Sequence, residues 1–161
     1  MTRSEVQVPH RPPVQGMLFC LAGIILRRMV LSGIAIKTGV REGRIGIAPY
    51  NEDQVEAAHV NLHLGETSNM NDNVLLVRAG SFVLAKTLER ITLPLGLCGS
   101  LEGRSKLAQR GISIEQSSTF IEPGSDTSMT LEIFNASTVD IELRLGQKVA
   151  KMVLMKITDD F

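Results

Sequence analysis

From Ser32 onward, apolar and polar positions alternate in short runs, the pattern of β-strands that are buried on one face. Over residues 60–64, for example, Val60, Leu62 and Leu64 alternate with Asn61 and His63. Gly, Pro and Asn interrupt these runs at short spacing, which is typical of an all-β sandwich or barrel. Strands are expected over residues 44–48, 59–64, 74–78, 81–87, 89–93, 97–101, 112–115, 118–121, 128–135, 139–144 and 148–157.

Short helical segments interrupt the strand pattern. Ser32 can cap a helix that runs to about Arg41 and stops at Gly43. A second helix is expected from Lys106 to Arg110, and residues 51–57 read as a single helical turn. The sequence contains no heptad pattern and no internal repeat. We therefore predict a β-rich domain with one or two short helices.

The first 28 residues differ from the rest in composition. Residues 1–28 are expected to form an N-terminal extension, and residues 29–161 a single domain, because this length suffices for one hydrophobic core. The extension contains an apolar run, residues 17–26, which is too short to cross a bilayer as a helix. Arg27 and Arg28 follow where a secretory signal would need its cleavage site. We expect residues 1–28 to form either an extra strand or a partly disordered upstream segment.

Composition narrows the classes of partner. The 17 basic and 17 acidic residues balance, which argues against a protein that coats nucleic acid. Aromatic residues are scarce, with no Trp, one Tyr and five Phe, so base-stacking platforms are not indicated. Cys20 and Cys98 are expected to be reduced thiols. These features favour a cytoplasmic protein that binds neither nucleic acid nor a membrane.

Candidate chemistry concentrates between Gly99 and Asn135. The turn Gly103-Arg104-Ser105 precedes a short helix, where unpaired N–H groups and a guanidinium suit phosphate. Glu132, between Leu131 and Ile133, lies on the opposite strand face from both and can transfer protons. The local patterns alone also allow a solvent-facing Glu132 and a solvated Arg104 beside a helix cap.

Several motifs, in this order, resemble the dCTP deaminase / trimeric dUTPase superfamily over roughly residues 29–156. They are VLSGIA (30–35), RIGIAPYNEDQVEAAHVNLHLG (44–65), RAGSFVLAKTLERITLPLGLCGSLEGRSKLAQRG (78–111), IEPG (121–124) and TLEIFN (130–135). The resemblance implies a distorted jelly roll, the β-clip dUTPase-like fold, that assembles as a homotrimer with active sites shared between subunits. A run of motifs in order is more specific than any one of them.

The resemblance also implies a reaction. In dCTP deaminases the Glu at position 132 activates water for attack on C4 of cytosine, which converts dCTP to dUTP without zinc. Mg²⁺ is expected only through the phosphates of the pyrimidine deoxynucleoside triphosphate. The chain lacks the H-x-E and P-C-x-x-C pattern of zinc deaminases, and His59 and His63 have no evident third ligand.

By the same resemblance, the nucleotide phosphates are bound at Arg104, Ser105 and Lys106, and Ser105 also touches the base or the attacking water. Glu122 stands where the family has the Asp of an I-D-P-G turn that contacts the deoxyribose. Ser118 falls at the position whose backbone carbonyl helps to hold the base and the water.

Lys106 replaces a second Ser of the family motif, and four further departures from the family pattern bear on activity. Residues 124–128 stand where family members have an aromatic residue and a Gly, and Asn61 replaces the Asp of V-D-L. Gln109 stands where an Arg pairs with the catalytic Glu, which leaves the Glu132 carboxylate less stabilised. The sequence ends at Phe161, about where relatives continue into a tail that covers the nucleotide. Two alternatives therefore stay open: a dUTP diphosphatase in which Glu122 orients water, and a non-catalytic nucleotide-binding relative.

Overall fold

The computed structural model describes residues 30–116 and 119–158. Its elements follow in the order α1 (Gly33–Arg41), β1 (Gly46–Ala48), the 3-10 turn η1 (Glu52–Gln54), β2 (Val60–His63), β3 (Met70–Asn71), β4 (Val74–Val77), β5 (Phe82–Thr92), β6 (Leu97–Gly103), α2 (Ser105–Ala108), β7 (Ile112–Ser113), β8 (Phe120–Ile121), β9 (Asp126–Asn135), β10 (Ile141–Arg144) and β11 (Lys148–Lys156). The expected β-rich architecture with short helices is confirmed.

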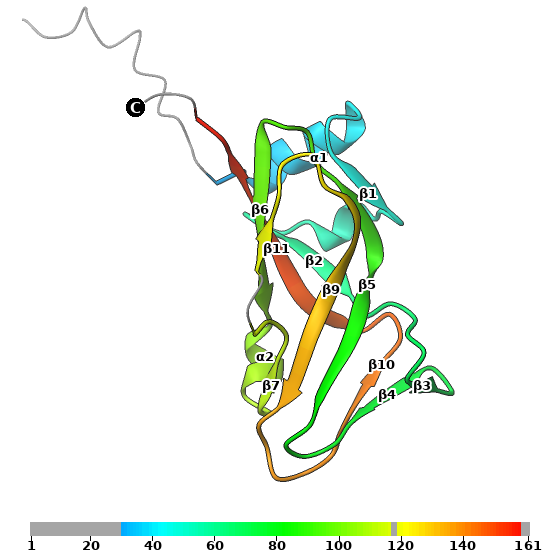
Figure 1. Ribbon diagram of the computed structural model, residues 1–161. Helices are drawn as coiled ribbons and strands as arrows, with labels where there is room; N and C mark the ends of the chain where they lie inside the picture. The colour runs from blue at the N-terminus through cyan, green and yellow to red at the C-terminus, as the bar shows by residue number, and fades with distance from the viewer. Residues whose placement is uncertain (1–29, 117–118, 159–161) are drawn as a thin grey trace, which may run out of the picture.

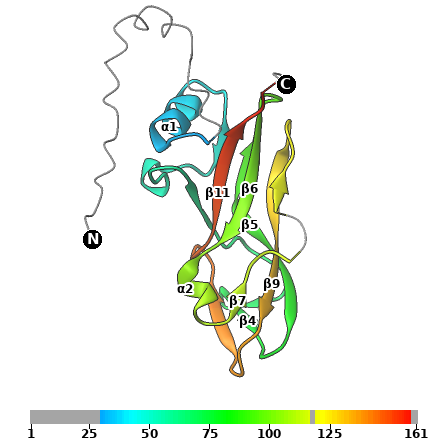
Figure 2. The same ribbon diagram turned by 90° about the vertical axis from the view of Figure 1, so that its left-hand side faces the viewer.

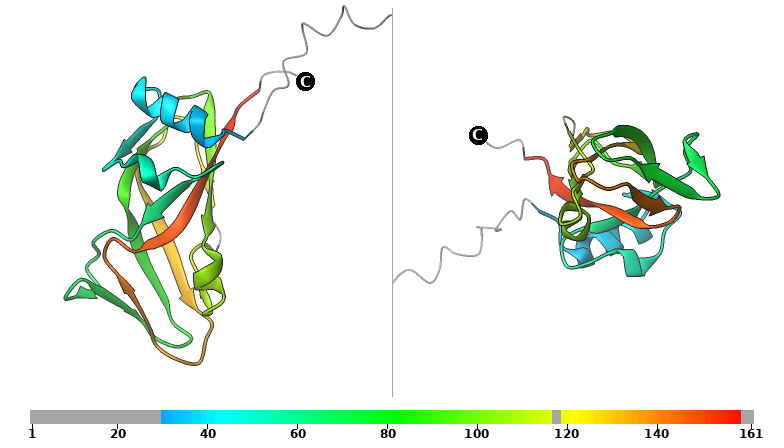
Figure 3. Two further views of the ribbon diagram at one scale, coloured as in Figure 1. Left: turned by 180° about the vertical axis from the view of Figure 1, so that it is seen from behind. Right: turned by 90° about the horizontal axis from the view of Figure 1, so that it is seen from below.

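The strands form three antiparallel sheets, with orders β1-β5-β9-β7, β10-β4-β3 and β2-β11-β6-β8. The paired strands β5 and β9 run side by side along most of the molecule (Figure 1). Helix α1 lies near one end, and α2 with β7 lies toward the other (Figures 1 and 2). Seen from below, the sheets wrap around a common interior (Figure 3).

Strand alternation buries one face of each long strand in this interior. Leu62 of β2, Ile91 of β5, Leu131 of β9, Leu143 of β10 and Leu154 of β11 all have no exposed area. Each side chain of this size contributes about 1.5–3 kcal/mol to folding relative to full exposure. Polar residues lie mainly on the opposite faces of the same strands.

One expected break in the strand pattern is wrong. Residues 81–87 and 89–93 were expected as two strands, but they form the single strand β5, with a bulge between Lys86 and Arg90. The Thr87 hydroxyl donates to the Glu89 carbonyl at 2.7 Å and accepts from the Met129 N–H at 2.9 Å, which holds the bulge in the sheet. A bulge keeps the chain extended where Leu-Glu suggested a turn.

Strand β3 was not expected from the sequence. It pairs with β4 across the tight turn at Asp72 and Asn73, whose φ angles are 50° and 64°. Two successive positive φ angles are the geometry of a type I′ hairpin, for which Asp and Asn are suited residues.

The helical segments lie where they were expected, but two of them are shorter. Ser32 caps α1 by accepting from the Ala35 N–H at 3.3 Å, as predicted. The turn expected over 51–57 is reduced to η1, and the helix expected over 106–110 is the four-residue α2. None of the helices among the described residues has the length and apolar character needed to span a membrane.

Candidate functional site

A cavity of about 320 Å³ opens where β2, β11 and the Gly103-Arg104-Ser105 turn meet. Its lining is mostly cationic and polar, and consists of Glu56, His59, Asn61, Arg104, Ser105, Lys106 and Lys151. The three residues expected to bind phosphate, Arg104, Ser105 and Lys106, therefore line one cavity. An excess of positive side chains over the single carboxylate suits an anionic ligand.

A larger cavity, about 870 Å³, lies beside α1 and contains none of the expected site residues. Its lining is largely apolar, with Leu31, Ile45 and Leu97 among its residues. The smaller cavity is the candidate site, because charged and hydrogen-bonding groups, rather than volume, are what bind an anion.

Sheet register explains why residues far apart in sequence share the smaller cavity. In the sheet β2-β11-β6-β8, Asn61 pairs with Lys151, and Lys151 pairs with Glu102, so these side chains form a row on one face. Lys151 Nζ lies 4.0 Å from Glu102 Oε2. Gly103, at the end of β6, pairs with Ala150, which places Arg104 beside this row.

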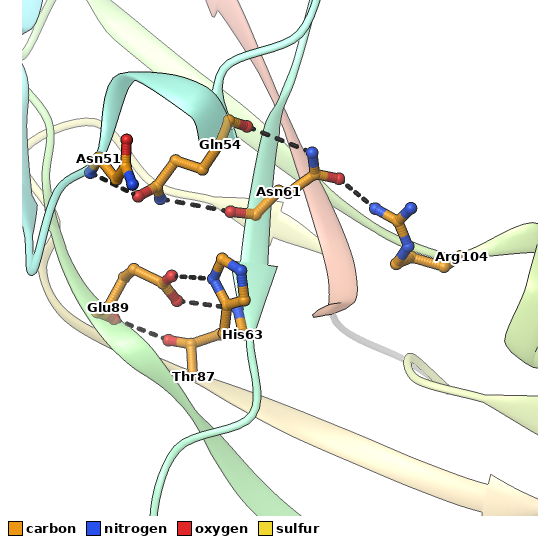
Figure 4. Close-up of polar contacts among 7 residues, drawn as sticks. All are labelled: Asn51, Gln54, Asn61, His63, Thr87, Glu89 and Arg104. Carbon is orange, nitrogen blue, oxygen red and sulfur yellow. Dashed lines mark hydrogen bonds and ion pairs between the residues drawn. The ribbon is translucent and has the colours of Figure 1, made fainter. Parts of the chain in front are cut away.

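Asn61 holds Arg104 at the edge of the cavity (Figure 4). Its side-chain oxygen accepts a hydrogen bond from Arg104 Nη1, and its Nδ2 donates to the Gln54 carbonyl and to Glu56 Oε1, both at 3.3 Å. Gln54 Nε2 donates back to the Asn61 carbonyl at 3.3 Å. Asn61 is only 1% exposed, so its amide group is held in the folded interior. Because it is neutral, it orients the guanidinium without cancelling its charge.

The positive potential of the cavity comes from side chains rather than from a helix dipole. Helix α2 has one turn, its N-cap residue is Arg104, and no side chain caps it. So short a helix contributes little macrodipole, and the helix-start argument for phosphate binding is correspondingly weak. Arg104, Lys106 and Lys151 supply the charge directly.

This positive potential affects the pKa of His59, which also lines the cavity. Burial lowers the pKa of His59 below its usual value, and the charges of Lys151 and Arg104 lower it further. The Glu56 carboxylate and the Asn61 side chain act in the opposite direction. In the ligand-free protein His59 is therefore biased toward its neutral form.

Glu132 lies on the outer face of β9, as strand alternation predicts. Its neighbours Leu131 and Ile133 are fully buried on the inner face, and across the ladder Glu132 pairs with Leu84 of β5. The carboxylate is half-buried and its Oε2 accepts the Gln116 N–H at 3.0 Å. The Glu132 N–H donates to the Ile114 carbonyl at 2.8 Å, which extends the β7–β9 pairing up to this residue.

Two consecutive residues join Glu132 to the cavity turn. Glu115 Oε1 accepts the Gly103 N–H at 3.1 Å, and the next backbone N–H, that of Gln116, donates to Glu132. The other oxygen of Glu115 is buried and has no hydrogen-bond partner within the described residues. The sequence analysis did not identify this link, because Glu and Gln are common surface residues. The only indication was that Glu115 and Gln116 lie between two of the family motifs.

Gln109 and Glu122, also expected at the site, lie outside the cavity. Gln109 is exposed at the end of α2, where its N–H donates to the Ser105 carbonyl at 2.9 Å. Glu122 is exposed in the turn after β8, and its carbonyl accepts from the Ser125 N–H at 3.2 Å and from the Ser125 hydroxyl at 2.6 Å. Ser118 and Cys20 lie outside the described residues, and Cys98 is a free thiol.

His63 has a structural partner on β5. Its Nδ1 lies 2.5 Å from Glu89 Oε1, and its backbone N–H donates to Glu89 Oε2 at 2.9 Å (Figure 4). Glu89 is 1% exposed, so the His63–Glu89 pair connects β2 to β5 in the interior of the fold. Within residues 30–116 and 119–158, no group of three His, Cys, Asp or Glu side chains is placed to hold a metal ion.

Comparison with known proteins identifies the family of the chain. Residues 66–157 match the family model described as dCTP deaminase-like. The dUMP-forming dCTP deaminase of Mycolicibacterium vanbaalenii is 30% identical over 155 residues, which cover 81% of this chain and 82% of that protein. That of Corynebacterium glutamicum is also 30% identical, with the same coverage. The chain belongs to the dCTP deaminase-like family.

Solved structures share the fold. The 2′-deoxycytidine 5′-triphosphate deaminase from Agrobacterium tumefaciens superposes with a TM-score of 0.67 at 17% identity over 81% of this chain. The match spans about half, 49%, of that deaminase chain. A dUTPase mutant from phage phi11 of S. aureus gives a TM-score of 0.57 at 14% identity, covering 73% of this chain and 93% of the dUTPase. The dUTPase-like fold expected from the motifs is thus confirmed.

Proposed function

We propose that the protein deaminates dCTP to dUTP, with Glu132 activating the water. One observation carries the proposal: two hydrogen bonds connect the half-buried Glu132 carboxylate to the turn beside the cationic cavity. Gln116 N–H donates to Glu132, and the preceding residue, Glu115, accepts from the Gly103 N–H of the turn. A triphosphate in the cavity would place the attached nucleoside near Glu132. The relatives' names point to the same substrate.

The reaction consumes one water and releases ammonia. Glu132 accepts a proton from the water as its oxygen attacks C4 of cytosine, and then returns protons so that the amino group leaves as ammonia. The Gln116 N–H, at 3.0 Å from Oε2, orients the carboxylate and stabilises its ionised form. Ser105 would contact the base or the water, and the Ser118 carbonyl would help to hold them.

Phosphate binding falls to the cavity residues. Arg104 offers a planar fork of donors that Asn61 has already oriented, and Lys106 and Lys151 act as point charges. Glu122 would contact the deoxyribose. Gln109 stands at the position of the family's Arg, and it would offer a hydrogen bond where that residue offers a positive charge.

Mg²⁺ would enter as part of the substrate. Among the described residues, Glu56 is the one carboxylate that lines the cavity, against the three cations Arg104, Lys106 and Lys151, so these side chains do not form a site for the metal itself. The phosphates would hold the ion, whose charge offsets theirs. No step of the deamination passes through it.

The outer face of β5 and β9 supports assembly into a homotrimer. Phe82 and Leu84 are 51% and 53% exposed, and they pair across the ladder with Phe134 and Glu132. Exposed apolar side chains around a functional carboxylate favour burial against a second copy of the chain. Such an interface would shield Glu132 from bulk water and share the site between subunits, in keeping with a cytoplasmic nucleotide enzyme.

A second activity is favoured by the relatives that form dUMP. The same site would then add a second water to dUTP and release dUMP and pyrophosphate, with Glu122 orienting that water. The third candidate, a nucleotide-binding protein without turnover, is favoured by Gln109 at the position of the family's Arg.

One pair of assays separates these candidates. The purified full chain is incubated with dCTP and Mg²⁺, and in parallel with dUTP and Mg²⁺, and ammonia and pyrophosphate are measured. Ammonia alone from dCTP indicates the deaminase, and ammonia with pyrophosphate indicates the coupled reaction. Pyrophosphate only from dUTP indicates the diphosphatase. Nucleotide binding without either product would contradict the proposal and support the non-catalytic relative.

A further inference from the structure

His59 occupies a position in the cavity that the phosphate motif does not account for. It lines the same 320 Å³ space as Arg104, Lys106 and Lys151, and it lies directly before β2, two residues ahead of Asn61. Its side chain is half-buried, so a ligand that fills the cavity meets it. A His residue here adds a group whose charge changes near neutral pH to a site whose other cations are permanent.

We infer that His59 is a proton-linked phosphate contact, which is neutral in the empty cavity and protonated when a polyphosphate chain is bound. The inference rests on the proposed function only in taking the cavity as the phosphate subsite. It adds that nucleotide binding takes up a proton, so that affinity falls as pH rises through the neutral range.

The charges around His59 give the direction of this coupling. Lys151 on β11 and Arg104 after β6 disfavour its protonation, and Glu56, in the loop before β2, favours it. Lys106 adds a further positive charge to the lining. A bound polyphosphate would reverse the balance, because several negative oxygens would then face the imidazole. The pKa of His59 would rise on binding, and a proton would move from solvent to the ring.

His59 and Arg104 line the same cavity as Asn61, which lies two residues after His59. Asn61 accepts a hydrogen bond from Arg104 Nη1 and so fixes the guanidinium in this lining. A polyphosphate bound by Arg104 in a cavity of this size would therefore also face His59.

The probe that isolates this property is inorganic tripolyphosphate, because it contains the phosphate chain without base or sugar. Its binding to the full chain is measured by calorimetry between about pH 6 and pH 8, in two buffers of different ionisation enthalpy. The wild type is compared with His59→Gln, which stays neutral, and with His59→Lys, which stays charged. Thermal melting of each variant verifies that it is folded.

The expected result has two parts. At neutral pH the wild type takes up more protons than His59→Gln, by a difference that approaches about one per site. Its affinity also falls more steeply with pH than that of His59→Gln, by up to about tenfold over the range. His59→Lys binds tripolyphosphate with the shallow pH dependence of a permanent charge. If His59 only shaped the cavity, its substitution would change the affinity for tripolyphosphate but not the proton uptake.

Equal proton uptake by the wild type and His59→Gln would overturn the inference, as would failure of tripolyphosphate to bind the wild type at any pH. A parallel assay with dCTP keeps the two claims apart. Ammonia release without His59-dependent proton uptake would retain the deaminase and reject the coupling. Proton-coupled binding without ammonia release would retain the coupling and reject the deaminase.

Discussion

The side-chain amide of Asn61 lies between the Arg104 guanidinium and the Glu56 carboxylate, accepting a hydrogen bond from the first and donating one to the second. A single buried residue thereby fixes Arg104, the proposed phosphate-binding group. The V-D-L motif that residues 60–62 resemble has Asp at this position, where this chain has Asn.

Asn61→Asp is expected to destabilise the protein despite the resemblance. A carboxylate at this site cannot donate to the Gln54 carbonyl or to Glu56 Oε1, and it would face the Glu56 charge. The loss of buried donors corresponds to about 1–3 kcal/mol of unfolding free energy. Chemical denaturation measures the change. Adding Glu56→Gln should recover part of it, because Gln can donate to Asp; no recovery would show that the Glu56 contact is unimportant.

Lys151 is expected to contribute to triphosphate affinity through its charge. Lys151→Gln should weaken dCTP binding about fivefold, which corresponds to about 1 kcal/mol, and the loss should shrink at high salt. The matched control is Lys148→Gln, which removes an exposed cation from the same strand but outside the cavity. Equal effects of the two variants on the Kd for dCTP would mean that only the net charge of the chain matters.

Sequence periodicity predicted much of the fold and part of the site. Alternation placed Glu132 and Asn61 on their strand faces, and Ser32 predicted the start of α1, because these are properties of neighbouring residues. His59 and Lys151 were not recognised as cavity residues. They meet because β2 pairs with β11, a strand some 90 residues later, and such pairing is set by the whole fold rather than by local pattern.

The bulge in β5 shows the same limit. The residues Leu88 and Glu89 suggested a break, whereas in the structure Glu89 turns inward to meet His63 of another strand. A buried carboxylate with a partner distant in sequence cannot be identified from a single strand. The one-turn α2 likewise ended earlier than its sequence indicated, and no side chain caps its start.

Glu89 is expected to be a stability residue rather than a site residue. Glu89→Ala would leave the half-buried His63 without its partner and should cost about 3–5 kcal/mol, or roughly 10 °C in Tm. Glu142→Ala, which removes an exposed carboxylate 3.4 Å from Arg144, should change stability by less than about 0.5 kcal/mol. Calorimetric melting compares them. Similar small shifts for both variants would contradict the structural role of the Glu89–His63 pair.

Gln109→Arg is expected to raise the deaminase rate by about tenfold, equivalent to about 1.4 kcal/mol in the barrier. The Arg would restore a cation at the position where the family pairs one with its catalytic Glu. Gln109→Met, of similar length but uncharged, serves as the control and should not raise the rate. Ammonia release at saturating dCTP is the measurement. A fall with Arg would mean that the pocket of this chain has been rebuilt around Gln.

The most direct measurement of the central claim is ammonia release from dCTP by the wild type and by Glu132→Gln, with dCTP binding measured for both. The isosteric amide keeps an oxygen that can accept the Gln116 N–H, so the fold and the nucleotide affinity should be retained. Without a base for the water, ammonia release should fall by about 10²–10⁴-fold. A Glu132→Gln protein that deaminates dCTP at the wild-type rate would contradict the account.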